Sequence, residues 1–231
     1  MKLHRFFIGN TELSHDFWMD DERLFHQWSR VLRFQIGQQV ILFNDAHEER
    51  LYEIKKIGTD AFHLNLVTEL VPKLPKRDVY LCFSLLKKDK NDWVLQKATE
   101  LGIRHFVPLL TDRTEKTGFD VERAEKIVTE AAEQCGRADI PRVREPLSLE
   151  SALKELEEKA QLYIAEQHDS ESGILEPDGV SLAVFIGPEG GWSDREKALF
   201  QERSIKHLNL SDFTLRAETA CISAAMQLTK V

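Results

Sequence analysis

The residues best suited to bind a ligand lie near the C-terminus, in the stretch Ile186-Gly187-Pro188-Glu189-Gly190-Gly191-Trp192. The apolar run 182–186 leads into this stretch and predicts a short buried strand. Ser193 and Glu196 follow at the spacing of a capping box, which predicts a helix from Asp194. Open α/β sheets bind ligands at such Gly-rich strand ends, because glycine lets backbone groups approach a ligand without a Cβ. By itself the turn is equally compatible with a β–α connection that binds nothing.

A second stretch downstream, Leu215-Arg216-Ala217-Glu218-Thr219-Ala220, has the residue types of a helix start beside a ligand. Unsatisfied N–H groups and the helix dipole at such a start attract an anion or an electron-rich group. The pattern also allows Glu218 simply to complement the dipole and Arg216 to be a surface charge. One Gly-rich turn is a weak signal, but the two stretches together favour a binding site.

Hydrophobic periodicity after residue 78 indicates the elements that would hold these stretches. Strands alternate with helices, which predicts an α/β fold with a parallel sheet covered on both faces. We expect strands over 79–86, 103–107, 162–165, 182–186 and 207–210, the second of them ended by Pro108, and helices over 91–101, 121–135, 149–160, 194–203 and 217–230.

The first part of the chain has a different pattern, rich in β-strands. A helix over 20–34 carries four apolar residues at helical spacing: Leu24, Trp28, Val31 and Leu32. Strand-like runs follow over 40–43, 51–57 and 61–67, separated by turn-forming residues, and predict a small β-barrel. A polar, proline-bearing linker over 72–77 then marks a boundary between a domain of residues 1–71 and one of residues 72–231.

Composition narrows the class of protein. The chain has 231 residues, of which 42% are apolar and 30% charged, which is typical of a soluble globular protein. No apolar run suits a membrane span or a signal peptide, so we expect a cytoplasmic protein without a membrane partner. The three cysteines match no zinc spacing, so we expect buried reduced thiols and no metal. A net charge of −8 argues against nonspecific coating of nucleic acid but allows a local basic face.

Residues 187–191 followed by 215–220 resemble the cofactor-binding signature of the RsmE family of SPOUT-class methyltransferases. Two further stretches are similar to the same family: Gln96-Lys97-Ala98-Thr99-Glu100-Leu101-Gly102, and Glu130-Ala131-Ala132-Glu133-Gln134-Cys135-Gly136-Arg137 with Pro141 after it. In the first domain, His26 with Arg30-Val31-Leu32-Arg33 and Gly37 is similar to the family's PUA-like RNA-binding domain. The resemblance covers nearly the whole chain. It departs from the family pattern at Ser211, where a glycine is usual, and at Thr214, where a hydrophobic residue is usual.

The resemblance implies a function and an architecture. The family methylates N3 of a uridine in 16S rRNA of the small ribosomal subunit, with S-adenosylmethionine as the cofactor. It implies a PUA-like barrel followed by a SPOUT α/β domain with a trefoil knot, in which the C-terminal segment passes through a loop. It also implies a homodimer whose interface includes the knot.

Site residues are carried over from the same resemblance. For the cofactor we expect two loops, with these residues: Ile186, Gly187, Pro188, Glu189, Gly190, Gly191, Leu210, Ser211, Thr214 and Leu215. For catalysis we expect Arg216 to stabilise the uracil anion, with Arg137 as the next candidate, and Glu218 to accept the proton if burial raises its pKa. For RNA contacts we expect five basic residues: Arg5, Arg30, Arg33, Lys97 and Arg137.

Other functions fit the sequence less well. A SPOUT methyltransferase that acts on tRNA or on a ribose hydroxyl is disfavoured by the stretches 96–102 and 130–137. A non-catalytic RNA-binding assembly factor is disfavoured by the intact glycine turn. A Rossmann-type enzyme is disfavoured because no Gly-x-Gly-x-x-Gly follows an early strand.

Overall fold

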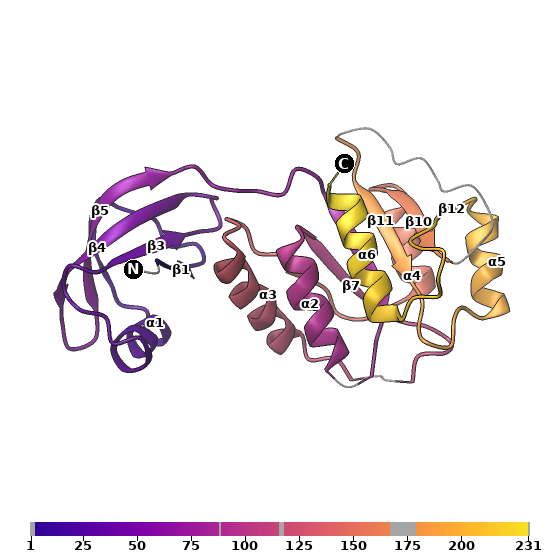
Figure 1. The fold of residues 1–231 in the computed structure, drawn as a ribbon, viewed down its shortest axis with the longest axis horizontal. Coiled ribbons are helices and arrows are strands. Elements are labelled where there is room, and N and C mark those ends of the chain that lie inside the picture. The colour runs from indigo at the N-terminus through magenta and orange to yellow at the C-terminus, as the bar shows by residue number, and fades with distance from the viewer. Residues whose placement is uncertain (1–2, 88, 116–117, 167–178, 231) are drawn as a thin grey trace. The chain divides into compact units, whose positions relative to one another are not determined.

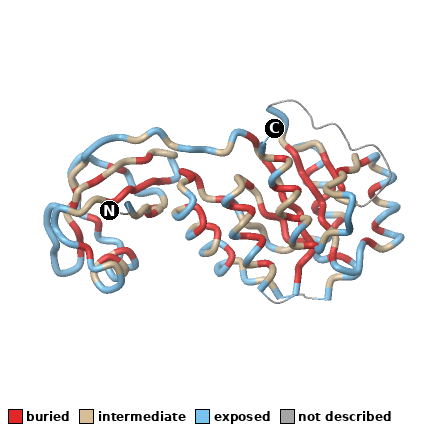
Figure 2. The backbone as a smooth tube through the Cα atoms, viewed as in Figure 1, coloured by how far each residue is buried: buried red, intermediate tan, exposed pale blue. Residues whose placement is uncertain are grey.

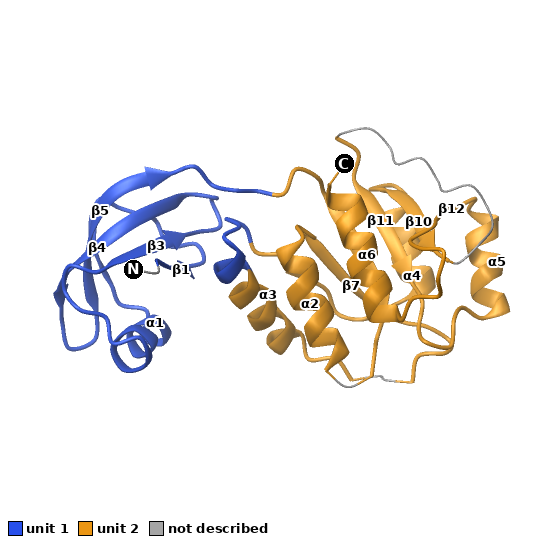
Figure 3. Cartoon of the chain, in the orientation of Figure 1, with its two compact units in different colours: residues 1–74, 132–139 blue, residues 75–131, 140–231 orange. Residues whose placement is uncertain are grey.

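The computed structural model describes residues 3–87, 89–115, 118–166 and 179–230. The chain divides into two compact units (Figure 3). Unit 1 consists of residues 1–74 and 132–139, and unit 2 consists of residues 75–131 and 140–231. The second segment of unit 1 contains the end of helix α3 (Val121–Cys135) and the loop that follows it.

Hydrogen bonds hold the segment 132–139 inside unit 1. The backbone N–H of Phe7 donates to the Glu133 carboxylate at 2.9 Å, and the Arg5 guanidinium donates to the backbone carbonyl of Arg137 at 3.0 Å. The N–H of Ala138 donates to the carbonyl of Lys73 at 2.9 Å. Unit 1 is therefore assembled from two parts of the chain.

Unit 1 is built on a five-stranded sheet with the order β1-β3-β4-β5-β2 (Figure 1). Its strands are β1 (His4–Phe7), β2 (Asp16–Met19), β3 (Gln39–Phe43), β4 (Glu49–Ile57) and β5 (Phe62–Leu70). The pair β1–β3 is parallel and the other pairs are antiparallel. Trp28 lies at the centre of the core, with its ring 5.1 Å from Phe6 and 5.3 Å from Phe62 between centroids. The sequence predicts β3, β4 and β5, whereas β1 and β2 have only four residues each and give too short a pattern.

The helix expected over 20–34 is shorter than predicted and irregular. Asp21 caps α1 (Glu22–His26), and a π-helical turn η1 (Gln27–Val31) follows directly. Leu24 and Trp28 are fully buried as expected, but the Val31 side chain is 66% exposed. A π-turn contains more residues than an α-turn, so it rotates later side chains away from the apolar face. The helical spacing that Val31 shares with Leu24 and Trp28 therefore does not place its side chain beside theirs.

Unit 2 contains a seven-stranded sheet whose pairs are all parallel, as the alternation of strands and helices predicts. The strand order is β12-β10-β11-β6-β7-β8, and β9 also pairs with β7. The strands are β6 (Val79–Ser84), β7 (His105–Leu110), β8 (Arg142–Val143), β9 (Leu147–Ser148), β10 (Gln161–Ala165), β11 (Leu182–Ile186) and β12 (Lys206–Leu208). Strands β8 and β9 have two residues each, too few for periodicity to detect.

Pro108 does not end its strand, contrary to the prediction. It lies inside β7, opposite Phe83 of β6. On its other side, β8 pairs with His105 and Phe106, while β9 pairs with Leu109 and Leu110. Pro108 thus falls in the gap between two short strands, where its missing N–H costs no hydrogen bond of the ladder.

Two groups of helices cover the two faces of the sheet (Figure 1). One face packs against α2 (Lys90–Glu100), α3 and α6 (Ala217–Thr229), and the other against α4 (Leu149–Leu156) and α5 (Asp194–Glu202). Side chains of β11 alternate between the two cores, and the central strands are buried throughout (Figure 2). Helix α4 ends at residue 156 rather than 160, and β12 ends at 208 rather than 210.

The cysteines agree with the expectation only in part. Cys82 and Cys221 are buried free thiols, and burial raises the pKa of both. Cys135, the last residue of α3, is exposed, contrary to the expectation of a buried thiol.

Glu196 anchors the start of α5 from a fully buried position. Its carboxylate accepts the N–H of Ser193 at 2.8 Å, completing the predicted capping box, and the N–H of Asp112 at 2.9 Å. We expect Glu196→Ala to lower the free energy of unfolding by about 2–4 kcal/mol, because two backbone donors lose a charged acceptor. Urea unfolding measures this effect, and Glu202→Ala at the exposed end of α5 is the control. A loss no greater than that of the control would contradict the anchoring role.

Asp112 makes stability depend on pH in the acid range. Hydrogen bonds from Arg195 and from the Ser193 hydroxyl lower the pKa of Asp112 from 3.8 to about 2. Since the pKa is lower in the folded state, this stabilisation is present above pH 3.8 and is lost as the pH falls toward about 2. We expect Asp112→Asn to flatten the fall of the urea midpoint between pH 5 and pH 2, and an unchanged slope would contradict this.

Candidate functional site

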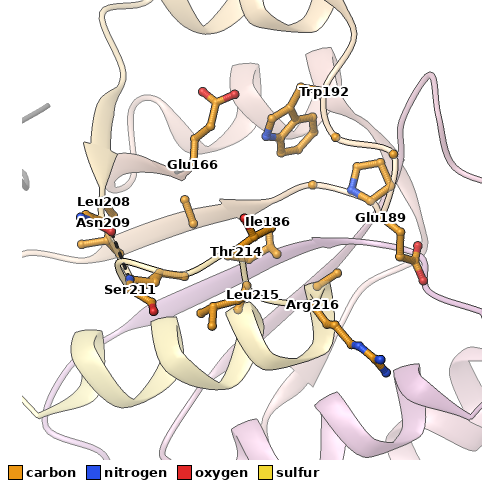
Figure 4. A pocket seen from close by; sticks show the side chains of 18 of the residues that line it. Glu166, Ile186, Glu189, Trp192, Leu208, Asn209, Ser211, Thr214, Leu215 and Arg216 are labelled. Carbon is orange, nitrogen blue, oxygen red and sulfur yellow. Dashed lines mark hydrogen bonds between the residues drawn. The ribbon is translucent and has the colours of Figure 1, made fainter. Parts of the chain in front are cut away.

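The two stretches singled out in the sequence line one cavity of about 530 Å³ (Figure 4). It lies where β10, β11 and β12 end, which is the edge at which parallel sheets bind ligands. All ten residues expected to bind the cofactor line it: Ile186, Gly187, Pro188, Glu189, Gly190, Gly191, Leu210, Ser211, Thr214 and Leu215. The cavity therefore joins two loops that are separate in the chain.

The wall formed by residues 187–191, here called the glycine turn, is tightly packed. A Cβ on Gly187 would lie 3.0 Å from the ring of Trp192. Trp192 is itself buried and packs edge-on against Phe200 of α5, with ring centroids 4.9 Å apart. The Arg113 guanidinium donates to the carbonyl of Gly190 at 2.7 Å. The aromatic ring beneath Gly187 thus leaves little room for a side chain at this position.

The opposite wall, residues 208–217, is shaped by Ser211. The N–H of Ser211 donates to the side-chain oxygen of Asn209 at 3.1 Å, and the N–H of Phe213 donates to the Ser211 hydroxyl at 3.1 Å. These two bonds form a compact turn without a glycine. The departure at Ser211 therefore leaves a structured loop, and Thr214 also lines the cavity.

Arg216 lies at the rim of the cavity, at the residue that caps α6. Its side chain is exposed, and the guanidinium makes neither a hydrogen bond nor an ion pair with the residues that the structure describes. An exposed cation at a helix start beside a cavity can hold an anionic group or stabilise a developing negative charge.

Glu218 has a different environment from the one a base requires. Burial would raise the pKa of Glu218, but a backbone hydrogen bond at the helix start and the nearby Lys90 ammonium together lower it below its usual value. Lys90 lies 3.1 Å from the carboxylate. The expectation that Glu218 accepts the proton required a raised pKa, and the shift in this structure is in the opposite direction.

Arg137 belongs to unit 1, not to the unit that holds the cavity. Its side chain is only 6% exposed and binds Asp139 through two hydrogen bonds of 2.9 and 2.7 Å. The structure does not bring Arg137 and Arg216 together within one unit. The arrangement gives Arg137 a structural role in unit 1, and a catalytic or RNA contact stays a prediction.

The other expected RNA contacts differ in their surroundings. Arg5 is mostly buried, forms an ion pair with Glu49 and lies over the ring of Phe43, 5.1 Å from its centroid. Arg30 and Arg33 are exposed, and the backbone of Arg33 is left-handed with φ +53°. Lys97 pairs with Glu100 at 2.8 Å on α2. Arg30 and Arg33 are therefore better placed than Arg5 to meet a phosphate.

Sequence reasoning missed four charged residues at the cavity. Arg113, Glu166 and Lys197 line it, and Lys90 pairs with Glu189 of the glycine turn at 3.5 Å as well as with Glu218. Each is far along the chain from its partners, and only its charge marks it in the sequence. Among the described residues, no group of three or more His, Cys, Asp or Glu could hold a metal ion. No described helix is long and apolar enough to cross a membrane.

Comparisons with known proteins point to one family. Residues 72–229 match the family described as RNA methyltransferase domain, and residues 30–67 match RNA methyltransferase PUA domain. Ribosomal RNA small subunit methyltransferase E of Rickettsia conorii is 29% identical over 235 residues (99% of this chain, 96% of that protein). The Aquifex aeolicus protein of that name is 33% identical over 206 residues (84% and 86%). A Legionella pneumophila protein solved with bound cofactor SAM is 28% identical and has a TM-score of 0.88, covering 100% of this chain and 98% of that chain.

Proposed function

Because the chain belongs to the RNA methyltransferase family, we propose that it methylates N3 of a uridine in 16S rRNA, using S-adenosylmethionine. The observation that carries the proposal is the single cavity between the glycine turn and the loop before α6, the two stretches of the family signature. The relatives named ribosomal RNA small subunit methyltransferase E support the substrate class. The choice of uracil N3 rests on the resemblance of the sequence motifs.

The cavity residues fit S-adenosylmethionine in size and chemistry. A volume of about 530 Å³ lies within the range that holds small molecules of roughly this size. Apolar side chains of Ile186, Leu210 and Leu215 suit an adenine ring, and the glycine turn offers backbone groups to its edge. Charged side chains of both signs on the lining suit a ligand that carries a carboxylate as well as positive charges. When bound, S-adenosylmethionine supplies an electrophilic methyl group on a sulfonium.

The residues of the chain then have two tasks: to position the cofactor and the target uracil, and to stabilise the charge that develops on the uracil. Arg216, at the rim, stabilises the negative charge that develops on the uracil as N3 loses its proton to solvent water. Glu218 holds Lys90 and the start of α6 rather than taking that proton, since its pKa is lowered. The target base must leave its stack to reach the cavity, as in other enzymes that act on bases.

The role of Glu218 can be tested by Glu218→Gln. At saturating cofactor we expect a methyl-transfer rate within about threefold of the unmodified chain, since loss of a general base typically costs about 10²–10⁴-fold. Single-turnover kinetics with the 30S particle measures this rate. A loss of a hundredfold or more would restore Glu218 as the base.

Unit 1 supplies RNA contacts in this proposal. Arg30 and Arg33 would bind phosphate, and the net charge of −8 favours a folded ribosomal particle over naked RNA. The proposal includes the division at residues 71 and 72 into a PUA-like and a SPOUT domain, the trefoil knot, the homodimer and a cytoplasmic location. The resemblance supports the two domain types, the knot and the homodimer, whereas the boundary rests on the linker over 72–77 and the location on the composition of the chain. Light scattering in solution tests the dimer.

The decisive experiment is mass spectrometry of 16S rRNA nucleosides from cells with and without this chain. We expect 3-methyluridine in 16S rRNA to disappear without the chain and to return when it is supplied. Unchanged 3-methyluridine would refute the substrate assignment. If, in addition, calorimetry showed no binding of S-adenosylmethionine, an assembly factor without catalysis would be the better explanation.

A further inference from the structure

Lys90, the first residue of α2, lies between two carboxylates that belong to the two sides of the cavity. Its ammonium nitrogen is 3.5 Å from a carboxylate oxygen of Glu189 in the glycine turn. The same nitrogen is 3.1 Å from a carboxylate oxygen of Glu218 in the first turn of α6. One cation from a third segment of the chain thus contacts both segments that enclose the ligand.

The contact of Lys90 with Glu218 is more buried than a surface ion pair, whereas the Glu189 side chain is 39% exposed. The Glu218 side chain is 16% exposed and the Lys90 side chain 29% exposed. Exposed ion pairs contribute little to stability, whereas a largely buried carboxylate that loses its cation is strongly disfavoured. Lys90 also separates two like charges, which would repel each other in its absence.

We propose that Lys90 is a positioning residue that holds the glycine turn and the start of α6 at the spacing that the cofactor requires. This inference rests on the proposed function, because it concerns the same cavity. Lys90 does not line the cavity among its described residues, so it acts through Glu189 and Glu218 rather than by touching the ligand. It therefore sets the affinity for the cofactor more than the rate of the chemical step.

The test compares Lys90→Met, which removes the charge, with Lys90→Arg, which keeps it. Isothermal calorimetry measures the Kd for S-adenosylmethionine and for S-adenosylhomocysteine. We expect the Kd to rise about tenfold for Lys90→Met and to stay within about threefold for Lys90→Arg. In kinetics, the KM for S-adenosylmethionine should rise while kcat stays within about twofold.

Lys159→Met is the matched control, since Lys159 pairs with Glu155 in the same unit but does not line the cavity. We expect it to leave Kd and KM unchanged. If Lys90→Met does not fold, Lys90→Gln serves the same comparison. Unchanged cofactor affinity in the folded Lys90 variant would overturn the inference, as would a loss confined to kcat. An unmodified chain that binds neither ligand would instead refute the proposed function.

Discussion

Gly187→Val should weaken the binding of S-adenosylhomocysteine about 100-fold, equivalent to about 2.8 kcal/mol. A Cβ at this position would already lie 3.0 Å from the ring of Trp192. Trp192 cannot retreat without disturbing Phe200, against which it packs. The turn must therefore move, and its backbone groups leave the positions from which they line the cavity. Isothermal calorimetry measures the change in Kd.

Gly118→Val provides the control for this substitution. A Cβ on Gly118 would meet nothing within 4 Å, so the added side chain should leave the Kd unchanged. Gly187→Ala should give an intermediate loss, because its single methyl group makes the closest contact but adds no branch. If Gly187→Val bound the ligand like the unmodified chain, the glycine turn would not form the wall of the cofactor site.

Arg216→Ala should lower kcat for methyl transfer about 10²–10³-fold, the usual cost of removing one group that stabilises transition-state charge. The Kd for S-adenosylmethionine should stay within about threefold, because the Arg216 side chain is exposed and points away from the other lining residues (Figure 4). Arg216→Lys should recover part of the rate, since the charge returns without the planar donor group. Single-turnover kinetics on the 30S particle separates this effect from product release.

Arg123→Ala is the matched control for Arg216, since Arg123 is an exposed arginine of unit 2 that pairs with Asp92 away from the cavity. It should leave kcat unchanged. A normal rate for Arg216→Ala would remove Arg216 from catalysis. A large rise in Kd instead would assign it to the binding of the cofactor.

Local sequence patterns predicted the strand and the helix start beside the cavity, but not the charged side chains around it. The strand 182–186 and the capping box of Ser193 and Glu196 depend on neighbouring residues, so the sequence contains the whole signal. Only the family resemblance predicted that the loop around Ser211 lies beside the glycine turn. Hydrophobic periodicity gave no signal for this. The contact of Lys90 with Glu189 and Glu218 depends on packing between distant segments, which no local pattern encodes.

Two features of the structure, at Pro108 and at Val31, differ from what local sequence patterns indicate. Pro108 ends a strand by the usual rule, but in this chain a gap between two short neighbouring strands accommodates it. Val31 has helical spacing, but a π-turn rotates it out of the core. Neither the pairing of the neighbouring strands around Pro108 nor the π-turn that contains Val31 follows from residue type and spacing alone.

The composite origin of unit 1 has a consequence for how the protein is made. The N-terminal 74 residues lack the segment 132–139, which supplies partners to Phe7, Arg5 and Lys73. During translation, unit 1 therefore cannot be completed until residues 132–139 are synthesised, after the first strands and helices of unit 2. Its early strands would spend that interval without their final contacts. Unit 1, although its first residues are synthesised first, would be completed only while unit 2 is already being synthesised.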